Sequence, residues 1–409
     1  MSPAQVAKSI QDGLGTILAS IALIVGFGAL LGKMLAESGG AEVVARTLLQ
    51  RFGKDKMHWT LLWIGLLVGV PVFFGVGVVL LVPILFTLVR QTQRPTLLLG
   101  IPLLAGLSVA HGLVPPHPGP IAAIGLLQST VGPTDVGRTI LYSLLIGVPT
   151  AAIAGPLFAK VICRKVVVQV PSSLVAEVRE RNVLPSFLVT TFTILLPVLL
   201  MLLASLADVT CDVRHPFRIW ADFLGHPVVA LLAGFLVSLY TFGFAMGSNG
   251  DQILKWLGES LRPVAEILLV VGAGGAFNKV LIEGGVGGAI ADSVKGWNLS
   301  PYLLGWTAAA LIRVATGSAT VAITTAAGLI APLVVQTPGL NRELLVIAMG
   351  AGSLILSHLN DGGFWFVKEY FQMSVPQMLK TWTIMETIIS VVALGLVFIL
   401  DAILKIIQS

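Results

Sequence analysis

The feature that most constrains this chain is its succession of long apolar segments. Several of them, such as 185–207 and 382–405, have the ~20 residues that an α-helix needs to cross a bilayer. Charged residues make up only 11% of the sequence, whereas a soluble domain has about 25%. A soluble protein could not bury so much apolar surface. The sequence therefore predicts an all-α polytopic membrane protein.

An internal repeat organises the chain. VGFGALLGKMLAESGGAEVVA (25–45) aligns with VGAGGAFNKVLIEGGVGGAIA (271–291), so that Lys33 meets Lys279 and Glu37 meets Glu283. Further along, FFGVGVV (73–79) lies over ATGSATV (315–321), and His111 lies over His358 at almost the same offset. Shared apolarity alone would rarely produce three blocks in one order. We expect two homologous halves joined by a linker.

Each half contains four membrane segments, and two of them are unusual. The second segment, 59–89 or 302–335, exceeds a simple crossing length and has Gly or Pro near its middle, so we expect a re-entrant hairpin. The third, 96–129 or 343–373, is interrupted by polar residues and predicts a discontinuous helix. The expected units are a first transmembrane repeat at 9–162, a basic cytoplasmic linker at 163–184, a connecting helix at 185–207 and a second transmembrane repeat at 226–405.

Lysine and arginine predict the orientation. With the hairpins counted as non-crossing, sixteen of the 25 basic residues fall on one side, in the segments 33–58, 90–95, 160–181, 245–262 and 368–380. The positive-inside bias makes this side cytoplasmic. The two halves then cross in opposite directions, as in the inverted-topology repeats of secondary transporters, which bind substrate near the midplane. The helix 226–244 has no counterpart before the first half, so the sequence also indicates a missing N-terminal helix or a start upstream of Met1.

The interruption PPHPGP (115–120) predicts one part of a binding site. Four prolines remove four amide hydrogens and stop a helix. Irregular backbone at membrane depth persists only against protein or a water-filled cavity. A half-helix that starts near Pro118 would direct free amides and a positive dipole end at the break, which suits a carboxylate. The expected ligands here are Pro116, His117 and Gly119. A simple proline kink is the alternative.

The second half predicts the rest of the site. SHLNDGGFW (357–365) and RVATGSAT (313–320) supply hydroxyls, an amide, imidazoles and backbone donors, an inventory that fits a polyhydroxylated anion. The expected substrate ligands are Thr316, Gly317, Ser318, Thr320, Asn360, Gly362 and Gly363, and the expected proton-coupling groups are Asp361, His358 and His111. Asp361 is the strongest candidate because an intramembrane acid is costly and functional by default. The histidines could instead be packing residues, and Arg313 could be a partner of a helix C-terminus.

Other polar and glycine-rich features have simpler interpretations. Lys33, Glu37, Lys279 and Glu283 lie near helix ends and indicate interfacial ion pairs. GVGVV and GAGGAF lie within apolar helices, where small residues favour close helix packing, and no nucleotide-binding context surrounds them. The net charge of +5 is spread over loops and does not indicate nucleic-acid binding. We expect no cofactor, no metal and no enzymatic activity.

Several of these stretches resemble a known family. LVPPHPGPIAA, IRVATGSATVA, VGAGGAFNKVL, SHLNDGGFWFVKEYF and KTWTIMETIISVV closely resemble the gluconate permease family, whose members are proton-coupled symporters of sugar acids. The resemblance covers nearly the whole chain. It implies import of gluconate or a similar hydroxylated carboxylate, with glycerate and D-serine as alternatives, in the inner membrane. The wider ion transporter superfamily adds inverted repeats, elevator-type movement and the suggestion of a homodimer.

The chain departs from the family at Gly75, where members commonly carry an acidic residue. If that acid takes part in proton coupling, coupling here rests on Asp361 and the histidines, or the protein is an uncoupled facilitator. A membrane redox enzyme with haem between histidine pairs is a further alternative. It is disfavoured because His111 and His117 lie in or beside a break, whereas haem ligands need continuous facing helices.

Overall fold

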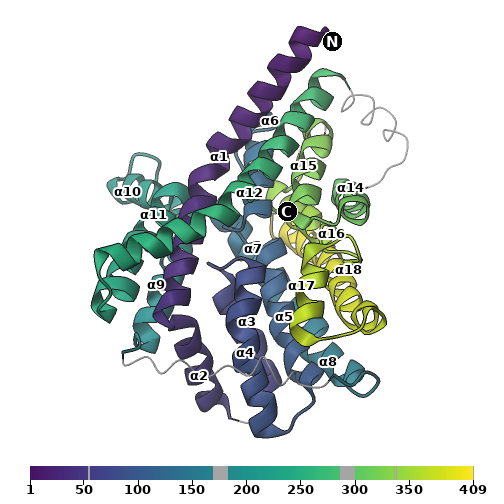
Figure 1. The fold of residues 1–409 in the computed structure, drawn as a ribbon. Coiled ribbons are helices and arrows are strands. Elements are labelled where there is room, and N and C mark those ends of the chain that lie inside the picture. The colour runs from purple at the N-terminus through teal and green to yellow at the C-terminus, as the bar shows by residue number, and fades with distance from the viewer. Residues whose placement is uncertain (54–55, 169–182, 286–299, 336, 338, 409) are drawn as a thin grey trace.

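The computed structural model describes residues 1–53, 56–168, 183–285, 300–335, 337 and 339–408, and within them the regular secondary structure is helical (Figure 1). Eight helical stretches of this described part are long and apolar enough to cross a membrane. The predicted all-α membrane class is therefore confirmed. Residues 169–182, which include Arg179 and Arg181 of the expected linker, and residues 286–291 of the repeat lie outside the described residues.

The first half is interrupted where the sequence predicts. Its helices are α1 (Pro3–Ser38), α2 (Gly40–Phe52), α3 (Met57–Gly69), α4 (Phe74–Thr92), α5 (Thr96–Leu113), α6 (Pro118–Thr130) and α7 (Val136–Ala152), which continues through a π-helical turn (Ile153–Leu157) into α8 (Phe158–Ile162). The gap between α3 and α4 follows Gly69 and contains Pro71. The gap between α5 and α6 contains Pro115 and Pro116, which cannot donate to the preceding turn.

The second half repeats this pattern after a connecting region. The connecting helices are α9 (Phe187–Thr210), α10 (Pro216–Gly225) and α11 (Pro227–Ser238), and the last continues through π and 3₁₀ turns to Met246. They are followed by α12 (Gly250–Glu283), α14 (Pro301–Thr316), α15 (Ala319–Val335), α16 (Arg342–Gly352), α17 (Gly362–Phe371) and α18 (Val375–Gln408). Gly317 separates α14 from α15 in a left-handed conformation, and the break between α16 and α17 ends at Asp361.

Two helices begin earlier than the apolar pattern indicates. Within the first predicted repeat, the apolar residues 14–35 form the inner part of α1, which starts at Pro3 in a capping box formed by Ser2 and Gln5. Likewise, α12 starts at Gly250, where the Asn249 side chain accepts a hydrogen bond from the Gln252 amide at 2.8 Å. Caps thus extend both helices beyond their apolar cores. The short helix α10 was not predicted.

The basic segments that were assigned to one side lie close together. Lys33 of α1 forms an ion pair with Glu259 of α12 at 2.9 Å, and Gln377 donates to the Val167 carbonyl at 3.2 Å. Figure 1 shows α2, the end of α4 and α8 at one end of the molecule, and the N-terminus at the other. The arrangement agrees with the charge pattern. The inverted relation of the halves, the re-entrant hairpins and the unit boundaries stay predictions.

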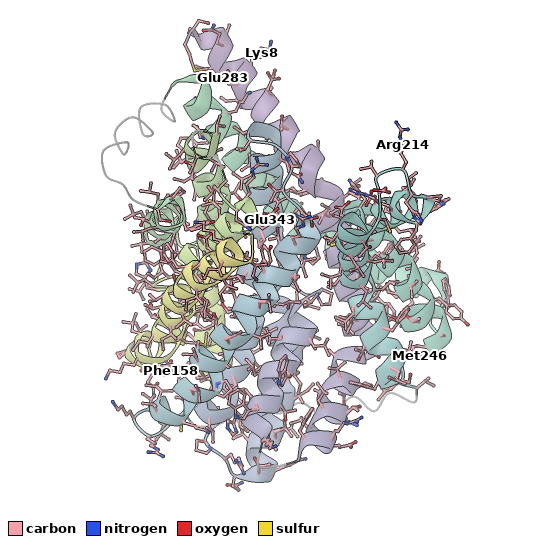
Figure 2. All side chains as sticks on the ribbon, turned by 180° about the vertical axis from the view of Figure 1, so that it is seen from behind. Lys8, Phe158, Arg214, Met246, Glu283 and Glu343 are labelled. Atoms are coloured by element: carbon pink, nitrogen blue, oxygen red, sulfur yellow. The ribbon has the colours of Figure 1, made fainter. Side chains whose placement is uncertain are left out.

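Small residues bring the long helices together. A Cβ on Gly13 of α1 would lie 2.5 Å from the Gly275 carbonyl oxygen of α12, and one on Gly77 would lie 2.7 Å from the Leu107 side chain. The packing role predicted for the two glycine-rich runs is therefore confirmed. The expected interfacial ion pairs Lys33–Glu37 and Lys279–Glu283 are also present, at 2.8 and 3.3 Å. Figure 2 shows Lys8 and Glu283 at the same end of this helix pair, where Ser9 donates to Glu283.

The broken helix α5–α6 lies at the centre of the molecule. In an 18-residue apolar stretch of the span Thr96–Thr130, 89% of the residues are buried, whereas the corresponding share in the other seven candidate spans is 50% or less. It contacts α3 and α7 of the first half and α15, α16 and α18 of the second. The site described below therefore forms where the two halves meet.

Candidate functional site

A polar cavity of about 300 Å³ lies between α5, the tip of α4, the two interruptions of the second half and α18. Most membrane-buried surface is apolar, so the concentration of ionisable groups here marks a functional-site candidate. Its lining residues are Phe74, Ser108, His111, Arg313, Gly317, Ser318, Ala319, Thr320, Leu354, Asp361, Gly362, Gly363, Trp382 and Glu386.

A buried ion pair forms one wall of the cavity. Arg313 in the last turn of α14 donates through Nη2 to Asp361 Oδ2 and through Nη1 to the Gly317 carbonyl. The two residues are only 4% and 8% exposed. Asp361 is also the N-cap of α17, because its Oδ1 accepts from the Gly363 amide at 2.8 Å. Arg313 thus bonds to the C-terminal end of α14, as one interpretation of the sequence indicates, and also lines the cavity.

A directed hydrogen-bond chain connects α18 to this ion pair. Trp382 donates through its indole N–H to Ser357 Oγ at 2.6 Å, and Ser357 donates to Asp361 Oδ2. Because an indole N–H can only donate, the single hydroxyl hydrogen of Ser357 is left for Asp361. Thr383 also donates to the Ser357 carbonyl at 2.5 Å. These contacts fix the position of the second break.

A second carboxyl group faces the same cavity from α18. Glu386 is 1% exposed, and its Oε1 lies 2.5 Å from the Ser108 hydroxyl of α5. Its Oε2 is buried and has no hydrogen-bond partner among the residues that the structure describes. This contact joins residues 278 positions apart. A carboxyl group in this position can carry a proton or accept a hydrogen bond from a substrate hydroxyl.

The two histidines of the first half have different surroundings. His117 is buried, and its Nε2 donates to the Gly69 carbonyl at 2.6 Å. His111 lines the cavity with its ring centroid 5.1 Å from that of His117, and its buried Nδ1 has no partner in the described part of the chain. The rings meet edge to face, an arrangement that leaves no space for a porphyrin between them.

The structure brings together seven of the residues that the sequence predicts for the site. His111, Gly317, Ser318, Thr320, Asp361, Gly362 and Gly363 all line the cavity. Pro116 and His117 instead line a separate space of about 20 Å³ against α1, the α3–α4 connection and α11. Gly119 lets α6 approach α15, since a Cβ there would lie 2.9 Å from the Ile323 side chain.

The other predicted ligands lie near the cavity without lining it. The Thr316 hydroxyl donates to the Ile312 carbonyl at 2.8 Å, and the Asn360 amide donates to the Val314 carbonyl at 2.8 Å. Both bonds hold the chain around Gly317. The His358 carbonyl accepts from the Asp361 amide at 2.9 Å, which closes the turn before α17. The ligand roles of these residues stay predictions.

Sequence reasoning missed Ser108, Trp382 and Glu386. For Glu386 a signal existed, because an acid within an apolar segment of membrane-spanning length is as exceptional as Asp361. Ser108 gave no comparable signal, since a serine in an apolar helix usually bonds to its own backbone. Its importance depends on a contact with a distant helix.

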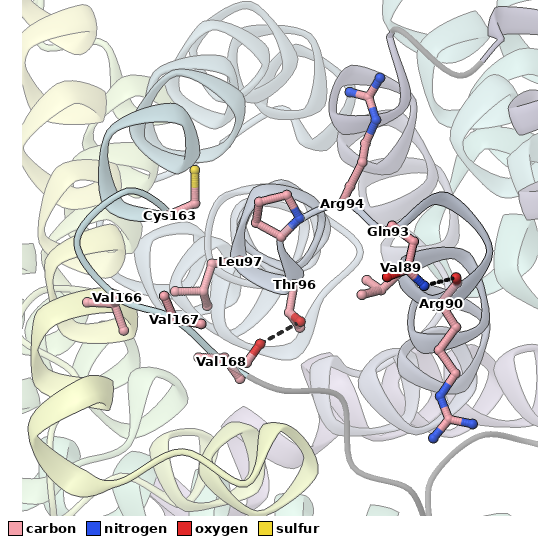
Figure 3. A pocket seen from close by; sticks show the side chains of 11 residues that line it. Val89, Arg90, Gln93, Arg94, Thr96, Leu97, Cys163, Val166, Val167 and Val168 are labelled. Carbon is pink, nitrogen blue, oxygen red and sulfur yellow. Dashed lines mark hydrogen bonds between the residues drawn. The ribbon is translucent and has the colours of Figure 1, made fainter.

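A larger cavity of about 440 Å³ lies at the junction of α4 and α5 (Figure 3). Thr96 donates to the Val168 carbonyl there at 2.8 Å, and Figure 3 shows the Arg90 and Arg94 guanidinium groups pointing in opposite directions, away from Thr96. None of the predicted site residues lines it. Within the described residues, no three His, Cys, Asp or Glu side chains gather as a metal site would require.

Comparison with known sequences decides the family. The sequence profile described as GntP family permease matches residues 1–403. The chain belongs to this family. It is 51% identical to the gluconate permease of Pseudomonas aeruginosa over 97% of this chain and 87% of that protein. It is also 44% identical to the high-affinity gluconate transporter of Escherichia coli, covering 95% and 88%, and 41% identical to the Gnt-II system L-idonate transporter of the same organism, covering 99% and 91%.

Solved structures support the fold of this permease. The YdaH transporter of Alcanivorax borkumensis, described as having an unusual topology, matches with a TM-score of 0.66 at 16% identity, over 99% of this chain and 90% of that one. MtrF of Neisseria gonorrhoeae matches with a TM-score of 0.67 at 15% identity, over 97% and 84%. The resemblance predicted from the sequence motifs is confirmed, and the chain is a multi-pass membrane permease.

Proposed function

We propose that this permease imports gluconate, or a sugar acid of similar size, across the cell's inner membrane by symport with protons. The observation that carries the proposal is the polar cavity, which combines an arginine, two carboxyl groups, a histidine and hydroxyls in the interior of an apolar helical protein. Similarity to gluconate and L-idonate transporters along nearly the whole chain supports the substrate class.

The cavity offers complementary groups to both ends of such a substrate. The N-terminal ends of α15 and α17 meet at Ser318–Thr320 and Gly362–Gly363, and their positive dipole ends favour the substrate carboxylate. Ser318, Thr320 and Ser108 present hydroxyls to the substrate's own hydroxyl groups. The volume of about 300 Å³ corresponds to a small ligand. This pose places the carboxylate at the second-half breaks rather than at the start of α6.

Proton coupling requires a cavity group whose charge depends on substrate occupancy. The sequence proposes Asp361, His358 and His111, and of these His111 and Asp361 line the cavity. A proton taken up with an anionic substrate limits the net charge that is buried during transport. Occupancy of the proton site and of the substrate site then favour each other reciprocally.

An elevator-type movement between inverted repeats completes the proposal. In support, a largely apolar gap of about 300 Å³, whose lining also includes the ion-paired Lys33 and Glu259, lies between the start of α4, α1 and α12. A weakly filled interface of this kind suits sliding of the substrate-binding helices against the long helices. The homodimer suggested by the superfamily resemblance stays a prediction.

The test is uptake of labelled gluconate into proteoliposomes with and without an inward proton gradient. A one-unit pH gradient supports about tenfold accumulation at one proton per substrate. Accumulation of this order that an uncoupler abolishes supports symport. Equilibration alone indicates the alternative, an uncoupled facilitator, and transport of glycerate or D-serine but not gluconate overturns the substrate.

A further inference from the structure

We propose that Glu386, bonded to Ser108, carries the coupled proton, and that Asp361 stays ionised and positions Arg313 for the substrate. The inference rests on the proposed proton symport and names the group that performs it. It departs from the coupling role that the sequence indicates for Asp361.

Every identified hydrogen bond to the Asp361 carboxyl is donated to it. Oδ2 accepts from Arg313 and Ser357, and Oδ1 accepts from the Gly363 amide. Ser357 accepts from the Trp382 indole, which has no acceptor, so a reversed bond to Asp361 would leave the Ser357 hydroxyl hydrogen without either of these two partners. A proton on Asp361 would therefore compete with the bonds donated by the guanidinium group, the hydroxyl or the amide. The surroundings of Asp361 favour a permanent anion.

The surroundings of Glu386 suit a group that gains and loses a proton. Its one hydrogen-bond partner in the described structure is the Ser108 hydroxyl, which can donate to the ionised carboxyl or accept from the protonated one. No cation contacts either oxygen within the described residues, because the Arg313 bonds that the structure shows are made to Asp361 and Gly317. Full burial without a paired cation favours the neutral carboxyl in this conformation.

The other charged or titratable groups that face this carboxyl are few. Among the described residues, the cavity contains Arg313 from α14, Asp361 from the start of α17 and His111 from α5. Arg313 and Asp361 neutralise each other as an ion pair. His111 is the alternative proton carrier, and the experiment below separates it from Glu386.

The transport cycle balances charge and protons. On the outer side, water delivers a proton to the Glu386 carboxylate and the anionic substrate enters the same cavity. On the cytoplasmic side, the substrate leaves and Glu386 returns its proton to water. Because an ionised Glu386 and a substrate carboxylate would repel each other within about 300 Å³, protonation raises substrate affinity. One proton with one monoanion makes transport electroneutral.

The test compares Glu386→Gln with the wild-type protein in proteoliposomes. The amide resembles a protonated carboxyl, so the variant should exchange external for internal gluconate at a rate similar to wild type. It should lose the accumulation of about tenfold that a one-unit pH gradient supports, and its exchange should no longer depend on pH. Asp401→Asn is the matched control, because Asp401 is a second buried carboxyl of α18 that bonds to Tyr302 and Lys405 outside the cavity. It should accumulate gluconate like wild type.

Other outcomes overturn the inference. If Glu386→Gln still accumulates gluconate at the wild-type level, another group carries the proton. His111 is that group if His111→Gln loses accumulation but retains exchange. A folded Glu386→Gln protein that neither binds nor exchanges gluconate makes Glu386 a substrate ligand. If Glu386→Gln does not fold, the proposal requires that Ser108→Ala shifts the pH dependence of gluconate exchange. An unshifted pH profile in Ser108→Ala contradicts the proposal. Failure of wild-type protein to accumulate gluconate refutes the proposed function instead.

Discussion

The break between α5 and α6 and the break between α16 and α17 are aligned by the sequence repeat, yet they differ in chemistry. Residues 112–120, which include the first break and the adjoining ends of α5 and α6, are all buried, and the His117 imidazole bonds to the backbone of α3. The second break contains Ser357 and Asp361, whose bonds join it to Arg313 and Trp382. The α5–α6 break is filled by packed residues, whereas the α16–α17 break contributes Asp361 to the cavity.

The α3–α4 and α14–α15 connections show the same asymmetry. PVFFG (71–75) is apolar, and Phe74 is its only contribution to the cavity among the described residues. TGSAT (316–320) contributes Gly317, Ser318, Ala319 and Thr320. Of the two sets of helix ends that the predicted repeat aligns, the set in the second half contributes most of the cavity lining. The first half supplies Ser108 and His111 from the continuous part of α5.

The largest expected contrast is between substitutions of two aligned glycines, Gly75 in α4 and Gly317 between α14 and α15. A Cβ at Gly317 would lie 2.1 Å from the Asn360 carbonyl oxygen, and φ is +76° there. At Gly75 the nearest atoms would be those of the Phe366 ring, at 3.9 Å. Gly317→Ala should therefore abolish gluconate transport, and Gly75→Ala should preserve it, in uptake assays normalised to membrane-inserted protein. Equal losses of gluconate uptake in the two variants would contradict the difference proposed between these two regions.

Removal of one partner of the buried ion pair should have the next largest effect. Arg313→Gln leaves Asp361 buried without its cation, which costs about 3–5 kcal/mol, so the thermal stability of the detergent-solubilised protein should fall strongly. The double variant with Asp361→Asn removes both charges and should recover most of the stability without recovering gluconate binding. If the double variant binds gluconate with normal affinity, Arg313 has no role in recognition.

Trp382→Phe should produce an intermediate effect. The substitution keeps most of the ring but removes the N–H that orients Ser357, a loss of about 1 kcal/mol. Freed from its donor, the Ser357 hydroxyl can rotate away from Asp361, so the KM for gluconate should rise modestly while the protein stays folded. An unchanged KM at all pH values would show that the hydrogen-bond chain does not affect the site.

The smallest effect is expected at the first break. His117→Gln can still donate to the Gly69 carbonyl and lies outside the cavity, so the KM for gluconate should change less than about twofold. His111→Gln alters the cavity wall and should change the KM more. A larger effect at His117 than at His111 would return the binding site to the first break, where the proline pattern placed it.

The interruptions were predictable because their causes are local. The consecutive prolines Pro115 and Pro116 and the left-handed Gly317 lie where helices end, whereas the isolated Pro102 lies within α5. Long apolar segments reveal the membrane class. The early starts of α1 and α12 depend on caps that apolar patterns do not show. Residues 250–261, part of the basic segment 245–262, therefore belong to α12.

The site was predictable only in part, because its composition depends on contacts between distant residues. Glycine, hydroxyl and acidic residues beside a break indicated the cavity lining. PPHPGP (115–120) lies outside this cavity because α6 packs against α15. Ser108 pairs with Glu386 because α5 approaches α18. Neither of these helix–helix contacts can be inferred from the sequence alone.

The most direct measurement of the central claim is substrate protection of single cysteines at the aligned positions Ser318 and Val76. With Cys163 and Cys211 replaced by serine, Ser318→Cys and Val76→Cys would each be labelled with a small thiol reagent, with and without gluconate. Ser318 lines the polar cavity, whereas Val76 lines the apolar gap beside α1 and α12. We predict that gluconate slows labelling at 318 and leaves labelling at 76 unchanged. Protection at 76 alone would contradict the assignment of the substrate site to the second half.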